Sequence, residues 1–142
     1  MNFAAGQDLL HYRLIEKIGE GGMGEIWKAV DTTLDREVAI KFIGRGLTGN
    51  TDRLARFVRE AKMLAALNHP NIAAVYGLHE STVSTPAPES VHFIAMELVP
   101  GEDLAQRLER GALAVEDAID VARQVAAALE AAHEQGVIHR DL

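Results

Sequence analysis

The sequence contains no cysteine, which excludes a disulfide framework and any metal site with cysteine ligands. Positive charge is also scarce, because 14 lysines and arginines face 21 aspartates and glutamates, for a formal net charge of −7. Without a basic face to displace counterions from phosphates, we expect no nucleic-acid partner. No apolar run reaches about 18 residues and no basic start precedes one, so neither a membrane-spanning segment nor a signal peptide is predicted. The six histidines show no metal-ligand spacing.

Glycine, in contrast, is concentrated near the start of the chain. Four glycines fall within six positions, at Gly19, Gly21, Gly22 and Gly24. Glycine loses more conformational entropy on folding than any other residue, so this density is costly for an ordinary loop. It suits a loop whose closely spaced backbone N–H groups approach a phosphate. The spacing alone is shared by nucleotide sites of different folds, and a flexible hairpin is the simplest alternative.

The residues around the glycines decide which kind of loop this is. Residues 12–18 and 25–30 each read as strands, the second with alternating side chains. A polar turn at 31–36 then leads into a third strand at 37–43, which is rich in β-branched residues. The glycines therefore close a hairpin. A dinucleotide-binding oxidoreductase needs a helix directly after them, and this alternative is set aside.

Val38-Ala39-Ile40-Lys41 on the third strand completes a recognisable pattern. A G-x-G-x-x-G-x-V loop followed by V-A-I-K is the signature of protein kinases, with Ile26 here in place of valine. From about Tyr12 to its last residue, the chain resembles a bacterial, eukaryotic-like serine/threonine protein kinase. The resemblance implies ATP and Mg²⁺ as cofactors, a protein substrate with Ser or Thr, and a kinase–kinase contact through the small lobe. It also implies that the nucleotide is bound by loop residues Ile18, Gly19, Glu20, Gly21, Gly22, Met23 and Gly24.

Lys41 carries the first chemical prediction. Ala39, Lys41 and Ile43 share one face of their strand, and that face looks buried rather than solvated. A buried ammonium needs a charge partner. The resemblance supplies two, namely the α- and β-phosphates of ATP and a glutamate on the following helix, which we identify as Glu60. The alternative for Glu60 is a half-exposed pair with Arg56.

Met96-Glu97-Leu98-Val99-Pro100-Gly101 resembles the hinge between kinase lobes. The resemblance implies that adenine pairs with the Glu97 carbonyl and the Val99 N–H, with Met96 as gatekeeper. The roof of the adenine slot would then consist of Ile18, Ile26 and Ala39. Met96 as simple strand core is an alternative that is compatible with this role.

His139-Arg140-Asp141-Leu142 matches the H-R-D-L opening of the catalytic loop. The resemblance implies that Asp141 accepts or orients the proton of the substrate hydroxyl. Taken alone, the motif leaves a surface pair of Arg140 and Asp141 as the alternative, and its place after a long helix and the earlier motifs favours the catalytic loop. No metal ligand is predicted within these residues, because the family's Mg²⁺ ligands follow this motif. His69 is predicted as a turn histidine satisfied by backbone, without a catalytic role.

The whole pattern predicts an α+β fold with a kinase-like small lobe, a hinge and the first two helices of an incomplete helical lobe. The small lobe is expected to contain a five-stranded antiparallel sheet and one helix. The expected segments are a lead-in at 1–11, the small lobe at 12–96, the hinge at 97–101 and the start of the helical lobe at 102–142. Within the small lobe we expect a helix at about 52–67, further strands at 72–78 and 91–98, and a polar surface loop at 81–90. Within the helical start we expect helices at 102–110 and 115–135.

These 142 residues lack the family's catalytic-loop Asn and D-F-G Asp, so we expect no ATP turnover by this chain alone. We also expect the apolar face of residues 115–135 to drive association or chaperone binding. The alternative is a non-catalytic module that docks on a full-length kinase and regulates it. We expect a cytoplasmic location, and family members often carry a membrane span well beyond the kinase domain.

Overall fold

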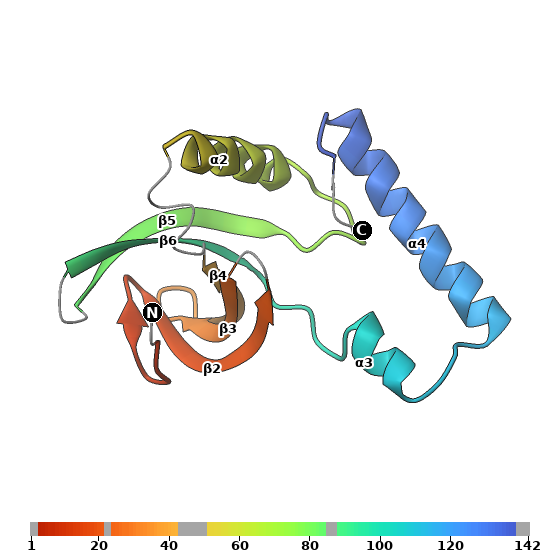
Figure 1. The fold of residues 1–142 in the computed structure, drawn as a ribbon, viewed down its shortest axis with the longest axis horizontal. Coiled ribbons are helices and arrows are strands. Elements are labelled where there is room, and N and C mark those ends of the chain that lie inside the picture. Colours follow the sequence, from red (N-terminus) through yellow and green to blue (C-terminus); the bar gives the residue numbers. More distant parts are fainter. Residues whose placement is uncertain (1–2, 22–23, 43–50, 85–87, 139–142) are drawn as a thin grey trace.

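The computed structural model describes residues 3–21, 24–42, 51–84 and 88–138, which form a curved sheet followed by two helices set to one side (Figure 1). Neighbouring strands are antiparallel throughout, in the order β1-β2-β3-β4-β6-β5. The predicted architecture, an antiparallel sheet with one helix and then two more helices, is confirmed. The elements are β1 (Asp8–Leu9), β2 (Tyr12–Gly21), β3 (Gly24–Asp31), β4 (Arg36–Phe42), α2 (Thr51–Ala65), β5 (Val75–Ser84), β6 (Pro88–Glu97), α3 (Leu104–Glu109) and α4 (Val115–Glu134).

The sheet has six strands rather than the predicted five, because β1 forms within the expected lead-in. Leu9 pairs with Tyr12 and is only 2% exposed. Phe3 also belongs to this region, with its ring stacked on Phe42 at a centroid distance of 3.7 Å. A two-residue strand has no periodicity to detect, so its pairing becomes visible only when the sheet is folded.

One face of the sheet carries the main hydrophobic core. Directly opposed residues in antiparallel strands point to the same side, so Trp27, Ile40 and Ala95 align across β3, β4 and β6. Phe93 lies fully buried among the rings of Tyr12, Phe42 and His79, at centroid distances of 5.3 to 5.9 Å. The buried cluster consists of Leu9, Tyr12, Leu14, Trp27, Ala29, Val38, Ile40, Phe42, Val83, Val91, Phe93 and Ala95.

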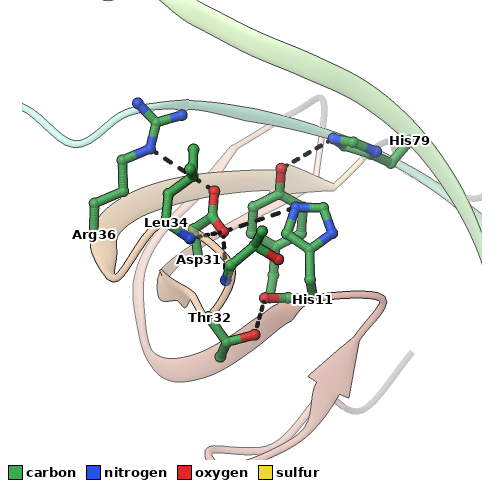
Figure 2. Close-up of polar contacts among 8 residues, drawn as sticks. His11, Asp31, Thr32, Leu34, Arg36 and His79 are labelled. Carbon is green, nitrogen blue, oxygen red and sulfur yellow. Dashed lines mark hydrogen bonds and ion pairs between the residues drawn. The ribbon is translucent and has the colours of Figure 1, made fainter.

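A cluster of polar side chains closes the turn between β3 and β4 (Figure 2). Asp31 is 2% exposed, and its Oδ1 accepts hydrogen bonds from the N–H groups of Thr33 at 3.0 Å and Leu34 at 3.1 Å. His11 and Arg36 each bring a ring or guanidinium nitrogen within 4 Å of the same carboxylate, at 3.9 and 3.8 Å. An aspartate that binds backbone N–H groups two and three residues ahead fixes a tight turn, so the predicted turn at 31–36 is confirmed.

Helix α2 packs against β5 on the face opposite the main core (Figure 1). It buries Ala61, which is 3% exposed, and the turn that follows it buries Leu67 at 9%. Its bounds agree closely with the predicted helix at about 52–67. Ala61 therefore lies on the side of α2 that contacts the sheet.

The β5–β6 hairpin is longer than predicted. The expected loop at 81–90 is instead mostly paired, with Thr82 opposite Ser90 and Ser84 opposite Pro88. Val83 is 4% exposed and joins the core cluster, which explains why this polar stretch extends as a strand. The first strand of this hairpin also starts later than predicted, because β5 begins at Val75 and not at residue 72.

Helices α3 and α4 follow the sheet. None of their described side chains is fully buried. A capping box fixes the start of α3, where Asp103 accepts from the Gln106 N–H at 2.7 Å and its own N–H donates to the Gln106 side chain at 3.1 Å. Gly136 adopts a φ of +76° just after α4, a conformation that favours glycine at the end of a helix. None of the described helices is long and apolar enough to cross a membrane. The exposed large apolar residues here are Leu104, Leu108, Val115, Ile119, Val125 and Ile138.

Candidate nucleotide site

The face of the sheet opposite the main core gathers several of the predicted site residues. Lys41 on β4 lies directly between Ile26 on β3 and Ile94 on β6. Two residues earlier on the same face, Ala39 lies directly opposite Met96 on β6. Lys41 is half-buried, Ala39 is 6% exposed and Ile94 is 6% exposed. The register therefore places Lys41 at a strand position flanked by apolar neighbours.

The glycine-rich hairpin borders this face, where β2 ends and β3 begins. The strands stay paired to its tip, with Gly19 opposite Ile26, Glu20 opposite Glu25, and Gly21 opposite Gly24. Gly24 has a φ of +131°, which side chains rarely adopt, so this position requires glycine. Gly22 and Met23 lie outside the described residues.

Gly19 has no comparable requirement within the protein itself. A Cβ built at this position would meet the Cβ of Ile26 at 3.8 Å, which is ordinary van der Waals contact. Among the described residues, neither backbone conformation nor crowding requires glycine here. A ligand that approaches the backbone closely would require one, and backbone N–H groups are suited to phosphate oxygens.

Ile18, predicted for the roof of the adenine slot, lies at an irregularity of β2. The register shifts between Lys17 and Gly19, so Ile18 is the extra residue on its strand, and it is 47% exposed. A bulge of this kind increases local twist and redirects a side chain. Ile26 is half-buried on the neighbouring strand.

Glu60 lies in α2 immediately before the buried Ala61. Helix α2 contacts β5, and β6 separates β5 from β4, the strand that carries Lys41. The Glu60 side chain is outside the described part of the chain, so the Lys41–Glu60 pair stays a prediction. Asp141 and the rest of the His139–Leu142 motif also fall outside it.

The predicted hinge begins where β6 ends. Met96 is half-buried, opposite Ala39 on β4 and Val75 on β5. The Glu97 N–H donates to the carbonyl of Ala74 at 2.8 Å, and the Glu97 carboxylate accepts from the Ala74 N–H at 3.0 Å. Val99, beyond the strand, is 62% exposed. The side chain of Glu97 thus anchors the start of the predicted hinge, whereas the sequence-based prediction concerned only its carbonyl.

A second group that sequence reasoning missed lies along the glycine hairpin. The Nζ of Lys17 contacts Oε2 of Glu20 at 2.6 Å and Oε1 of Glu25 at 3.1 Å. The indole N–H of Trp27 donates to Oε2 of Glu25 at 2.9 Å. This indole bond and the nearby Lys17 ammonium lower the pKa of Glu25, and the two carboxylates raise the pKa of Lys17. In a hairpin between β2 and β3, Glu20 and Glu25 face each other, and this pair of like charges is the sequence signal for a nearby cation such as Lys17.

His69 occupies the turn after α2. Its Nδ1 accepts a hydrogen bond from the Asn71 N–H at 3.1 Å, and its carbonyl accepts from Ile72 at the same distance. Its prediction as a turn histidine satisfied by backbone is confirmed.

Among the residues that the structure describes, no cluster of His, Asp or Glu could hold a metal ion.

Comparison with known proteins agrees with this arrangement. The model of the protein kinase domain matches residues 12–142. The serine/threonine-protein kinase PknA of Mycobacterium tuberculosis is 40% identical over 132 residues, which cover 92% of this chain and 30% of that protein. The probable serine/threonine-protein kinase PknB of Lactococcus lactis is 40% identical over 133 residues, covering 92% of this chain and 20% of that protein.

Similarity extends to solved structures. The crystal structure of the PknI kinase domain of Mycobacterium tuberculosis matches with a TM-score of 0.82 at 27% sequence identity. The match covers 99% of this chain and 55% of that one. This chain therefore spans about half of a solved kinase domain and less than a third of the curated relatives it matches.

Proposed function

Because the chain belongs to the protein kinase domain family, we propose that residues 1–142 are the amino-terminal half of a serine/threonine kinase domain. The complete domain would transfer the γ-phosphate of ATP to Ser or Thr hydroxyls of a protein substrate. The names of the relatives, serine/threonine-protein kinases from several bacteria, support this substrate class. Within the chain, we assign residues 12–96 to the small lobe, 97–101 to the hinge and 102–142 to the start of the helical lobe.

The observation that carries the proposal is the position of Lys41. Lys41 is a half-buried residue flanked by Ile26 and Ile94 beside the glycine-rich hairpin, and its positive charge suits an anionic partner on this face. The phosphates of ATP supply that charge, and Glu60 on α2 would steady the same amino group. The glycine at position 19, which the described neighbours do not require, supports a backbone that is approached by the same phosphates.

The adenine end of the nucleotide has its own candidates. Ala39 lies opposite Met96, and its small side chain would compete less with a flat ring on this face than a larger one would. We assign the roof to Ile18, Ile26 and Ala39, and the polar edge to the carbonyl of Glu97 and the N–H of Val99. Asp141 would orient the substrate hydroxyl. ATP, when bound with Mg²⁺, supplies the phosphoryl group and the cation that neutralises its charge.

We further propose that the 142 residues do not turn over ATP by themselves. They include none of the family's Mg²⁺-binding motifs, and phosphoryl transfer depends on that electrostatic stabilisation. The exposed apolar residues of α4, such as Val115 at 75% and Ile119 at 54%, support a helix that other segments normally cover.

The test uses an extended chain, in which residues 1–142 continue into the remainder of a kinase domain, for example that of PknA. We expect Lys41→Met to lower phosphate transfer to a basic protein substrate by roughly 100-fold or more, because a preorganised charge contact is lost. Lys28→Met is the matched control. Lys28 shares the face of Lys41 but its Nζ pairs with Glu37 at 2.7 Å, and losing such a pair should change the rate by about twofold or less. Transfer that survives Lys41→Met would contradict the assignment.

A further inference from the structure

The glycine hairpin contains an electrostatic conflict. Glu20 on β2 and Glu25 on β3 lie directly opposite each other, one pair from the end of the ladder. Like charges in opposed positions destabilise an antiparallel pair. The neighbouring glycines weaken the hairpin further, because they lose the most entropy when they become ordered. A hairpin with this sequence therefore needs a compensating contact to stay closed.

Lys17 supplies that contact. Its ammonium lies between the two carboxylates, at 2.6 Å from Glu20 and 3.1 Å from Glu25. Glu25 is held from its other oxygen by the indole N–H of Trp27, whose ring belongs to the buried core cluster. The contacts therefore run from both strands of the hairpin into the core of the sheet.

This network lies on the side of the hairpin away from the candidate nucleotide site. Glu25 and Trp27 are two residues apart and share one face, and Lys17 is the register partner of Trp27. Ile26, between them in sequence, points to the opposite face with Lys41. Lys17 therefore acts on the hairpin without lying on the face assigned to ATP.

We propose that Lys17 is a positioning residue for the glycine-rich hairpin, which it holds closed by neutralising two carboxylates that face each other across it. The inference rests on the proposed function, since the nucleotide that the hairpin covers is taken to be ATP. It adds that ATP affinity is set partly from the far side of the hairpin. Loss of Lys17 weakens the pairing of the hairpin and leaves two uncompensated negative charges on it, and both effects weaken binding of an anionic nucleotide.

The first test measures the hairpin itself. Amide hydrogen exchange of residues 19–21 and 24–26 is followed in the 142-residue chain and in the extended chain. We expect Lys17→Met to accelerate exchange there by about fivefold, in line with the loss of a partly exposed ion pair. Emission of Trp27, the single tryptophan of the 142 residues, is expected to shift as Glu25 loosens.

A second substitution separates this mechanism from general destabilisation. Glu25→Gln in the Lys17→Met background removes the charge conflict, while the amide oxygen can still accept from Trp27. We expect the double variant to exchange more slowly than Lys17→Met alone. The matched control is Arg13→Met, which removes another ion pair of β2, with Nε of Arg13 2.9 Å from Asp8. It should leave hairpin exchange unchanged, and equal acceleration by Arg13→Met and Lys17→Met would overturn the proposal.

The kinetic test uses the extended chain. We expect Lys17→Met to raise KM for ATP by about fivefold and to leave kcat within about twofold, because ground-state and transition-state binding of the nucleotide weaken together. An active parent chain whose KM for ATP is unchanged by Lys17→Met would overturn this inference alone. A parent chain without any ATP-dependent transfer would instead overturn the proposed function, and the nucleotide role of Lys17 with it.

Discussion

Glu97 holds the backbone of Ala74 through two hydrogen bonds that run in opposite directions. Its N–H donates to the Ala74 carbonyl at 2.8 Å, and its carboxylate accepts from the Ala74 N–H at 3.0 Å. Ala74 immediately precedes β5, and Glu97 is the last residue of β6. The segment that leaves the sheet toward the hinge is therefore fixed to the segment that enters it after α2.

This relationship predicts a graded response to substitution at Glu97. We expect Glu97→Ala to lower the free energy of unfolding by about 1 kcal/mol, because the Ala74 N–H loses a partner at a half-buried site. Glu97→Gln should cost less, since the amide oxygen can still accept. Denaturant midpoints of the two variants provide the comparison, and equal losses would show that the carboxylate does not act through Ala74.

The residues that the sequence placed on the face of the proposed nucleotide site are those with strong local patterns. Alternation along residues 37–43 was sufficient to put Ala39 and Lys41 on one side of a strand, and the register agrees. The contacts of Glu97 with Ala74 and of Lys17 with Glu25 join residues that are distant in sequence or in adjacent strands. Such contacts depend on register, which the pattern of one strand does not specify.

Strand β1 was also missed because its pairing depends on register, and its burial leads to a second prediction. Leu9 is 2% exposed within the core, so Leu9→Ala should lower the free energy of unfolding by about 2 to 4 kcal/mol. Its neighbour Leu10 is 55% exposed, and Leu10→Ala is the matched control, with an expected change within about 0.5 kcal/mol. Urea unfolding decides between them. Similar shifts for both substitutions would mean that residues 8–9 are a loose lead-in and not part of the core.

His79 makes the stability of the sheet depend on pH. Its ring is stacked on Phe93 at 5.3 Å, and its Nε2 lies 3.1 Å from the Tyr12 hydroxyl. Burial, and next the charge of His11, lower its pKa below the ordinary value of 6.5, against a smaller opposite effect of Asp31. The unfolded chain therefore binds a proton on this histidine at a pH where the folded chain does not.

The sign follows from this difference in protonation. The contribution of His79 is complete above pH 6.5 and is lost as the pH falls from there toward the lowered pKa, with a slope of at most about 1.4 kcal/mol per pH unit. We expect His79→Gln, which does not titrate, to flatten the unfolding free energy between about pH 7 and pH 5. His133→Gln is the control, since it removes an exposed imidazole at the end of α4, away from the sheet. If the His79→Gln and His133→Gln profiles follow the parent equally, the loss of stability in acid arises from other groups.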